Sequence, residues 1–112
     1  MPVITIKSHK LAKKLELEKI AKDISCQTGI ETARIKIMAE YYDPEDFFSG
    51  TIEELPIIHI EVAEKNGKEF IHNLMKVCKS TVAKHLNRMD NNIGVYAHPI
   101  GEGYLLVKDM FM

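Results

Sequence analysis

The chain carries the same short pattern twice, 54 residues apart, and this repeat constrains the fold more than any other feature of the sequence. The stretch PVITI at 2–6 recurs as PIIHI at 56–60. A polar connection follows each copy, and then apolar residues spaced i, i+3, i+4 and i+7, which indicates a helix with one buried face. These apolar residues are Leu17, Ile20, Ala21 and Ile24 in the first copy, and Ile71, Leu74, Met75 and Cys78 in the second.

A further β-branched run follows each predicted helix. Gly29 is the expected end of the first helix, and RIKIMA at 34–39 alternates as a half-buried strand does. In the second half a turn at 90–92 precedes a strand at 93–97. Each half therefore reads as a βαβ unit, whose two strands are parallel.

We predict one α+β domain over 1–112, in which two tandem βαβ units, at about 2–50 and 56–107, form a four-stranded sheet with both helices on one face. A minor tail strand is expected at 103–107. Helices on one side leave the other side bare, although the strand residues pointing that way include Val3 and Ile57. We therefore expect copies of the chain to associate and cover this face.

Composition excludes several classes of protein. With 46% hydrophobic residues and a net charge of -1, the chain is globular and has no overall attraction for nucleic acid or anionic membrane. It has no apolar run of the roughly 20 residues that a membrane span needs, and lysines interrupt any signal-peptide core, so we expect a cytoplasmic protein. Cys26 and Cys78 both fall in predicted helices, where we expect reduced apolar residues rather than a disulfide.

A duplicated βαβ chain that opens with Met-Pro-strand and repeats Pro-strand in the middle resembles the tautomerase superfamily, which includes 4-oxalocrotonate tautomerase and macrophage migration inhibitory factor. The pattern covers nearly the whole chain, and the resemblance implies a bacterial branch of the superfamily. The resemblance implies a homotrimer of double βαβ protomers, with three sheets around a central barrel and the helices outside. It also implies a cofactor-independent isomerase that acts on a small-molecule acid.

The resemblance assigns roles to particular residues. The N-terminal proline that the family uses as its base falls on Pro2, once Met1 has been removed, as is usual before a small residue. The arginine that opens the second strand and holds the substrate carboxylate falls on Arg34. Phe47 and Phe48 are the candidates for the aromatic residue that lines the pocket. The second arginine of some members falls on Ala12, so Lys13 is the nearby candidate for its role.

The chemistry fits these residue types. A tautomerase needs a base whose pKa lies near the working pH. An α-amino group titrates near 7.7 to 8.0, and an apolar wall with a nearby cation lowers that pKa by disfavouring the charged form. A guanidinium such as that of Arg34 binds a carboxylate through two parallel hydrogen bonds. The alternative for Arg34 is a solvated strand residue paired with an acid such as Glu40, and Phe47 and Phe48 are equally well explained as residues of a subunit contact.

Other readings of the chain stay open. The same fold can serve as a non-catalytic trimeric binding or assembly module, or the proline can hydrate or decarboxylate a related acid. The acidic segment at 40–55 is interpreted either as a solvated loop or as a negative lid that repels a dicarboxylate. The five histidines show no zinc-ligand spacing, so we expect no metal site and no other cofactor.

Overall fold

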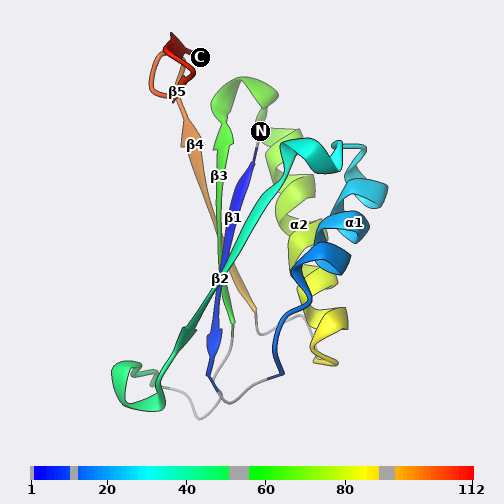
Figure 1. The fold of residues 1–112 in the computed structure, drawn as a ribbon, viewed down its shortest axis with the longest axis vertical. Coiled ribbons are helices and arrows are strands. Elements are labelled where there is room, and N and C mark those ends of the chain that lie inside the picture. Colours follow the sequence, from blue (N-terminus) through cyan, green and yellow to red (C-terminus); the bar gives the residue numbers. More distant parts are fainter. Residues whose placement is uncertain (1, 11–12, 51–55, 89–92) are drawn as a thin grey trace.

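The computed structural model describes residues 2–10, 13–50, 56–88 and 93–112. Figure 1 shows one sheet with two helices packed on one of its faces. The four long strands are β1 (Val3–His9), β2 (Lys36–Tyr42), β3 (Ile57–Ala63) and β4 (Gly94–Ile100). The helices are α1 (Leu17–Thr28) and α2 (Lys68–His85), and three short 3-10 turns are η1 (Thr32–Arg34), η2 (Pro44–Asp46) and η3 (Glu64–Asn66).

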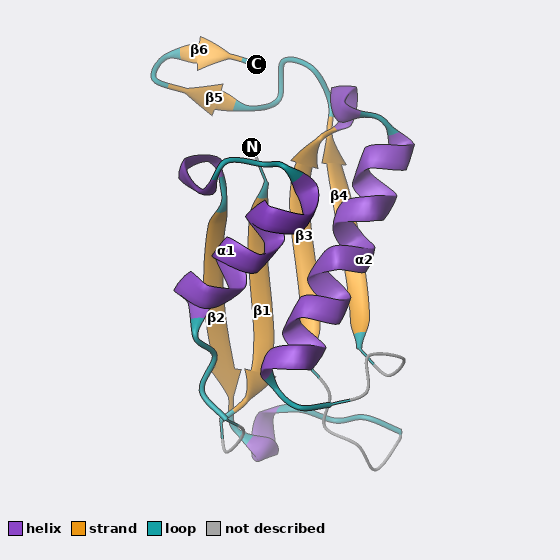
Figure 2. Cartoon of the chain, turned by 90° about the vertical axis from the view of Figure 1, so that its right-hand side faces the viewer, coloured by secondary structure: helices purple, strands orange, loops and turns teal. Residues whose placement is uncertain are grey.

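The strand order β2-β1-β3-β4 confirms the two tandem βαβ units. β1 pairs in parallel with β2, β3 pairs in parallel with β4, and β1 meets β3 in antiparallel fashion at the centre of the sheet. Because the two central strands run in opposite directions, the two repeats begin at opposite ends of the sheet. Both helices lie over the same face, as Figure 2 shows.

The core lies between the sheet and the helices. Alternate residues of β1 and β3, such as Ile4 and Ile58, are fully buried against the helices, because successive side chains of a strand point to opposite faces. Ile20 of α1 and Leu74 of α2 are also fully buried, and they form the helix side of this core. The two helices also contact each other through two side-chain hydrogen bonds. Gln27 Nε2 donates to Thr81 Oγ1 at 3.2 Å, and His85 Nε2 lies 2.9 Å from Asp23 Oδ2.

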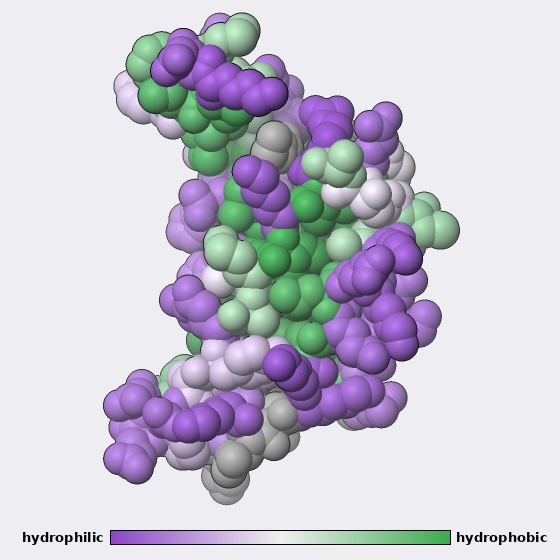
Figure 3. All heavy atoms as spheres, viewed as in Figure 1, coloured by the Kyte–Doolittle hydropathy of each residue, from purple (hydrophilic) through white to green (hydrophobic). Residues whose placement is uncertain are grey.

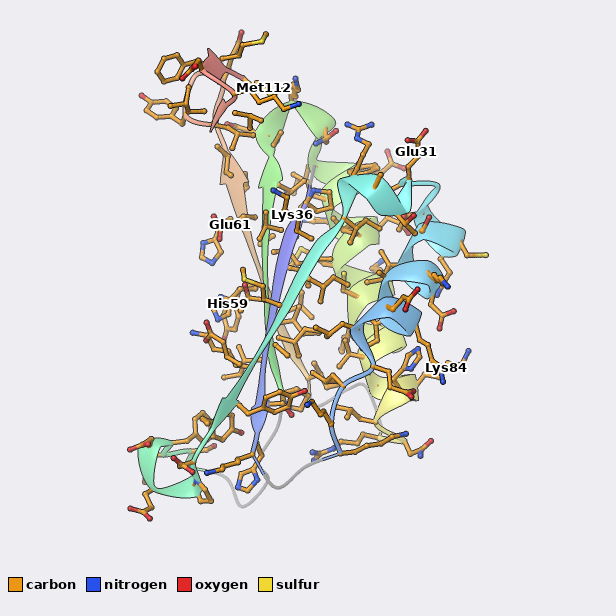
Figure 4. All side chains as sticks on the ribbon, viewed as in Figure 1. Glu31, Lys36, His59, Glu61, Lys84 and Met112 are labelled. Atoms are coloured by element: carbon orange, nitrogen blue, oxygen red, sulfur yellow. The ribbon has the colours of Figure 1, made fainter. Side chains whose placement is uncertain are left out.

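The other face of the sheet has no helix over it. Met38 on β2 and Tyr96 on β4 are each more than half exposed there. His59 and Glu61 point to this bare side, away from the helices, in Figure 4. The expectation of a sheet with one uncovered, partly apolar face is therefore confirmed for one copy of the chain.

The structure corrects two details of the predicted elements. The second strand begins at Lys36 rather than at position 34, because Arg34 N–H and Ile35 N–H donate to Glu31 and Thr32 carbonyls and close the η1 turn. The tail strand is only β5 (Leu106–Val107), which pairs with β6 (Met110–Phe111) in a separate hairpin. The predicted turn at 90–92 lies outside the described residues.

The cysteine prediction is half right. Both thiols are free, but only Cys78 is buried, and burial raises the pKa of its thiol to about 12. Cys26 lies on the exposed side of α1.

In the described part of the chain, no helix is both long and apolar enough to cross a membrane.

Candidate active site

Pro2 lies at the start of β1, where the chain enters the sheet. The residue is buried, and its carbonyl accepts a hydrogen bond from Lys36 N–H at 3.2 Å, which fixes it beside the start of β2. It lines a cavity of about 250 Å³ whose walls come from four parts of the chain. The lining residues are Pro2, Thr28, Gly29, Ile30, Glu31, Arg34, Val62, Asn66 and Phe70.

The turn between α1 and β2 brings Arg34 to this cavity. α1 ends at Gly29, whose φ of 80° lies in the left-handed region and whose N–H donates to Ser25 O at 2.9 Å. The chain then reverses through η1 and delivers Arg34 immediately before β2. Because β1 and β2 are parallel and in register from Val3 opposite Lys36, the start of β2 lies next to Pro2. Two of the predicted site residues, Pro2 and Arg34, therefore line the same cavity.

A second cavity, of about 240 Å³, adjoins the first at this end of the sheet. Arg34 and Asn66 line both cavities. The second one has the C-terminal hairpin as one wall and the ends of β3 and β4 as the others. Its apolar lining consists of Ala63, Ile100, Leu105, Val107 and Met112, and its polar lining includes Lys65 and Glu102.

Asn66 lines both cavities and was not among the residues that the sequence indicated. It belongs to the run Lys65-Asn66-Gly67, which is typical of a turn and shows no other signal. In the structure its Nδ2 donates to Ala63 O at 3.1 Å, so the side chain is held against the end of β3. The pairing of β3 with β1 then places this turn beside Pro2, and that placement depends on contacts distant in sequence.

Three predicted site residues lie at the other end of the sheet. Lys13 follows β1, and Phe47 and Phe48 follow β2, whereas Pro2 and Arg34 precede these strands. Figure 1 shows the η2 turn at the end of the sheet opposite to the N-terminus. Phe47 stacks on Tyr42 with ring centroids 4.6 Å apart, and Phe48 is 90% exposed. Within one chain, none of the three lines the cavity of Pro2.

The acidic segment that was interpreted as a lid is also at that far end. Asp43, Glu45 and Asp46 come directly after β2, and Asp43 forms an exposed ion pair with Lys10 at 3.2 Å. Glu53 and Glu54 lie outside the described residues. A negative lid formed by Asp43, Glu45 and Asp46 over Pro2 of the same chain is therefore wrong, because the end of β2 lies a full strand length away from the start of the parallel strand β1.

The arrangement can hold an anion beside a buried proline. Arg34 supplies a charge that persists at any relevant pH and five donors in a planar fork. Glu31 is the acidic residue that shares the Pro2 cavity with it. Among the residues that the structure describes, no three histidine, cysteine, aspartate or glutamate side chains come together as ligands for a metal ion.

Comparison with known proteins places the fold. No family model matches the sequence, and no curated protein matches it either. Solved structures do match: a fused 4-OT in an asymmetric trimer has a TM-score of 0.82 at 13% identity, over 97% of this chain and 94% of the other. A member of the cis-3-chloroacrylic acid dehalogenase family has a TM-score of 0.79 at 14% identity, over 98% of this chain and 82% of the other.

A native fused 4-OT is similar to the same degree, with a TM-score of 0.81 at 11% identity over 97% of this chain and 94% of the other. These are structures of the tautomerase superfamily, and the resemblance seen in the sequence is confirmed at the level of the fold. The chain has the tautomerase fold.

Proposed function

We propose that this chain is a cofactor-independent, tautomerase-like isomerase that moves a proton on a small keto, enol or unsaturated carboxylic acid. The Pro2 nitrogen is the general base, and Arg34 anchors the substrate carboxylate. The observation that carries this proposal is the shared cavity, since Pro2 and Arg34 come from segments about 30 residues apart in sequence and line one space. The fold of the solved relatives supports it.

The reaction needs few groups. The carboxylate of the acid binds the Arg34 guanidinium, which leaves the carbon next to the carbonyl facing Pro2. The proline amine takes a proton from that carbon, the electron pair of the C–H bond moves toward the carbonyl oxygen, and the same amine returns the proton at another position. Burial of Pro2 and the nearby positive charge of Arg34 both favour the neutral, basic amine.

The amine exists only where Pro2 is the first residue of the chain. A preceding Met1 turns its nitrogen into an amide, which is neither a base nor a nucleophile. Met1 lies outside the described residues. Its removal is accordingly part of the proposal.

We also propose that the active form is a homotrimer. The bare face of the sheet and the exposed apolar side chains of the C-terminal hairpin need a cover that one copy lacks. The fused 4-OT structures include trimers. In such an assembly we keep Lys13, Phe47 and Phe48 as substrate-binding residues, supplied to the site of a neighbouring copy.

The test uses three forms of the chain: one that begins at Pro2, one that retains a residue before it, and Pro2→Ala. Mass spectrometry defines each terminus, and the ketonisation of a phenylpyruvate enol is followed by absorbance. We expect activity in the first form, none in the second, and a reduced rate in the third, whose primary amine is still a base. Light scattering should give a trimer mass for all three.

Equal activity of the first two forms, or no activity of any form on a panel of enol and keto acids, would overturn the proposal. The alternative, a non-catalytic trimeric module, would then explain the fold. A monomer mass at micromolar concentration would remove the trimer from the proposal.

A further inference from the structure

We infer that His59 and His98, on the bare face of the sheet, form a binding site for a zinc ion. This inference does not depend on the proposed function, since neither histidine lines the cavity of Pro2. The sequence predicted no metal site because the histidines show no zinc-ligand spacing along the chain. These two histidines are 39 residues apart, and the pairing of β3 with β4 brings them together.

The register of β3 and β4 places both imidazole rings on the same face. His59 lies opposite Tyr96, and Glu61, two residues further along β3, lies opposite His98. Side chains two residues apart in a strand share a face, so all four point away from the helices. Figure 4 shows His59 and Glu61 on that side, and Figure 3, drawn from the same direction, shows hydrophilic residues on this margin of the molecule.

The distance between the two rings fits one tetrahedral zinc ion. His59 Nδ1 lies 3.4 Å from His98 Nε2. Two nitrogens bound to tetrahedral Zn²⁺ at roughly 2.0–2.1 Å are about 3.3 to 3.4 Å apart, whereas the right angles of the square-planar geometry that Cu²⁺ prefers bring them to about 2.9 Å. The observed separation therefore favours Zn²⁺ over Cu²⁺.

The two rings are already close to the orientation that this ion needs. Their planes differ by 16° and their centroids are 5.7 Å apart, so the facing nitrogens lie between the rings. The His59 ring also stacks on Tyr96 with centroids 5.4 Å apart, which limits its rotation out of this plane. Because His98 is exposed and His59 half-buried, small changes of their side-chain torsions can direct both lone pairs to one ion.

The charges around the pair favour a cation. Glu40 on β2 and Glu61 on β3 act on His59 with negative charge. Lys7 on β1 acts on it with positive charge, so these three groups leave one net negative charge beside two neutral imidazoles. Among the described residues, no third histidine, cysteine or carboxylate completes a group of three ligands. Water therefore fills the two other tetrahedral positions of the ion.

The binding experiment uses Zn²⁺ alone at pH 8, where imidazole is largely in the neutral form that binds metal. Calorimetry should give one Zn²⁺ per chain of the wild type, and the ring nitrogen resonances of His59 and His98 should shift with it. We expect His59→Ala and His98→Ala each to bind at least about tenfold more weakly, since even the loss of a residue that only orients a ligand costs that much. Mg²⁺, which prefers oxygen ligands, should leave the ring resonances unchanged.

Two control variants test the location. His72→Ala removes an exposed histidine of α2, and His85→Ala removes a ring that lies 2.9 Å from Asp23 Oδ2, another close pair of potential ligands. Both should bind Zn²⁺ as the wild type does. Thermal unfolding gives a second readout, because an ion that binds only the folded pair stabilises the fold. Zn²⁺ should raise the Tm of the wild type and of both controls, but not that of His59→Ala or His98→Ala.

Three results would overturn the zinc site. The first is equal Zn²⁺ affinity of the wild type, His59→Ala and His98→Ala, and the second is that saturating Zn²⁺ leaves the ring resonances of both histidines unchanged. The third is loss of binding in His85→Ala alone, which would place the ion at Asp23. The proposed function is tested separately, because His59→Ala and His98→Ala should leave turnover of an enol acid unchanged.

Discussion

The two ends of the sheet are built from the same repeat, yet they offer different chemistry. At one end Pro2 leads into β1 and lines a cavity with Arg34. At the other end Pro56, its counterpart 54 residues later, leads into β3 and is fully buried. Pro56 is an internal residue, so its nitrogen is always an amide. Both βαβ units therefore have the same strands and helix, but only a proline at the chain terminus can have a basic nitrogen.

The connections after the two helices differ as well. α1 has 12 residues and stops at Gly29, and the short turn after it delivers Arg34 to the Pro2 cavity. α2 has 18 residues and runs past the equivalent position, Ala83, which is buried in the core. Arg88, which is 54 residues after Arg34, therefore follows a longer helix. The shorter first helix is thus followed by the turn that brings Arg34 to the Pro2 cavity.

The largest effect is expected from the two arginines. Arg34 is exposed in one copy of the chain, so the proposed site needs the substrate and a neighbouring copy to exclude water from it. Arg34→Ala should then reduce kcat/KM for a small enol acid by about 2 to 5 kcal/mol of transition-state stabilisation, the range for loss of one partner of a desolvated charge pair. Arg88→Ala is the matched control at the other end and should leave kcat/KM unchanged. Steady-state kinetics and urea unfolding of both variants separate activity from stability. A loss of stability in Arg34→Ala with normal turnover would instead make Arg34 structural.

The next comparison concerns the core beneath the two helices. Ile20 in α1 and Leu74 in α2 are equivalent in the repeat and both fully buried. Substitution by alanine should cost about 2 to 5 kcal/mol of unfolding free energy in each case. We expect Leu74→Ala to cost more, since α2 contributes six buried residues and α1 two, which leaves less freedom to close the new cavity. Urea unfolding measures both, and an equal or reversed order would contradict this argument.

Much of the fold could be predicted from the sequence, because the repeat shows helix spacing and strand alternation twice. The C-terminal hairpin could not be predicted in the same way. Its turn residues Lys108 and Asp109 have φ of 50° and 67°, a conformation that hairpins usually fill with asparagine and glycine. Without those residues, no turn signal separates β5 from β6 in the sequence.

The site was predictable in part for a simple geometric reason. In a βαβ unit both strands start at the same end of the sheet, so Arg34 just before β2 joins Pro2 just before β1. The same rule sends Phe47 and Phe48, which come after β2, to the opposite end. Asn66 could not be found, because its place beside Pro2 depends on the antiparallel pairing of β1 with β3.

A smaller effect is expected at the helix ends. Gly29→Ala should destabilise the fold by about 1 to 2 kcal/mol, because an L side chain is unfavourable at a φ of 80°, even though space for a Cβ is open there. Ala83→Gly makes the reverse change inside α2 and should cost about 1 kcal/mol through lost helix propensity. Thermal unfolding measures both. No loss in Gly29→Ala would show that α1 can end without a left-handed residue.

The smallest effect is expected from His59, which lies on β3 between the two ends of the sheet. Its Nδ1 lies 3.4 Å from His98 Nε2, and its ring stacks on Tyr96. Partial burial and the positive charge of Lys7 on β1, with His98 on β4, lower the pKa of His59, and Glu40 on β2 and Glu61 on β3 oppose them. The unfolded chain therefore binds more protons below its ordinary value of 6.5, and stability should fall as the pH drops through that value.

Wild-type protein should thus lose more stability than His59→Gln between pH 8 and pH 5, by less than about 1 kcal/mol, because a partly exposed group interacts weakly. His72→Gln, on the exposed side of α2, is the matched control and should follow the wild type. Urea midpoints at a fixed protein concentration measure the difference. If His59→Gln and the wild type lose stability in parallel, protonation of His59 does not lower the stability of the folded chain. The loss of stability at low pH then arises from other groups.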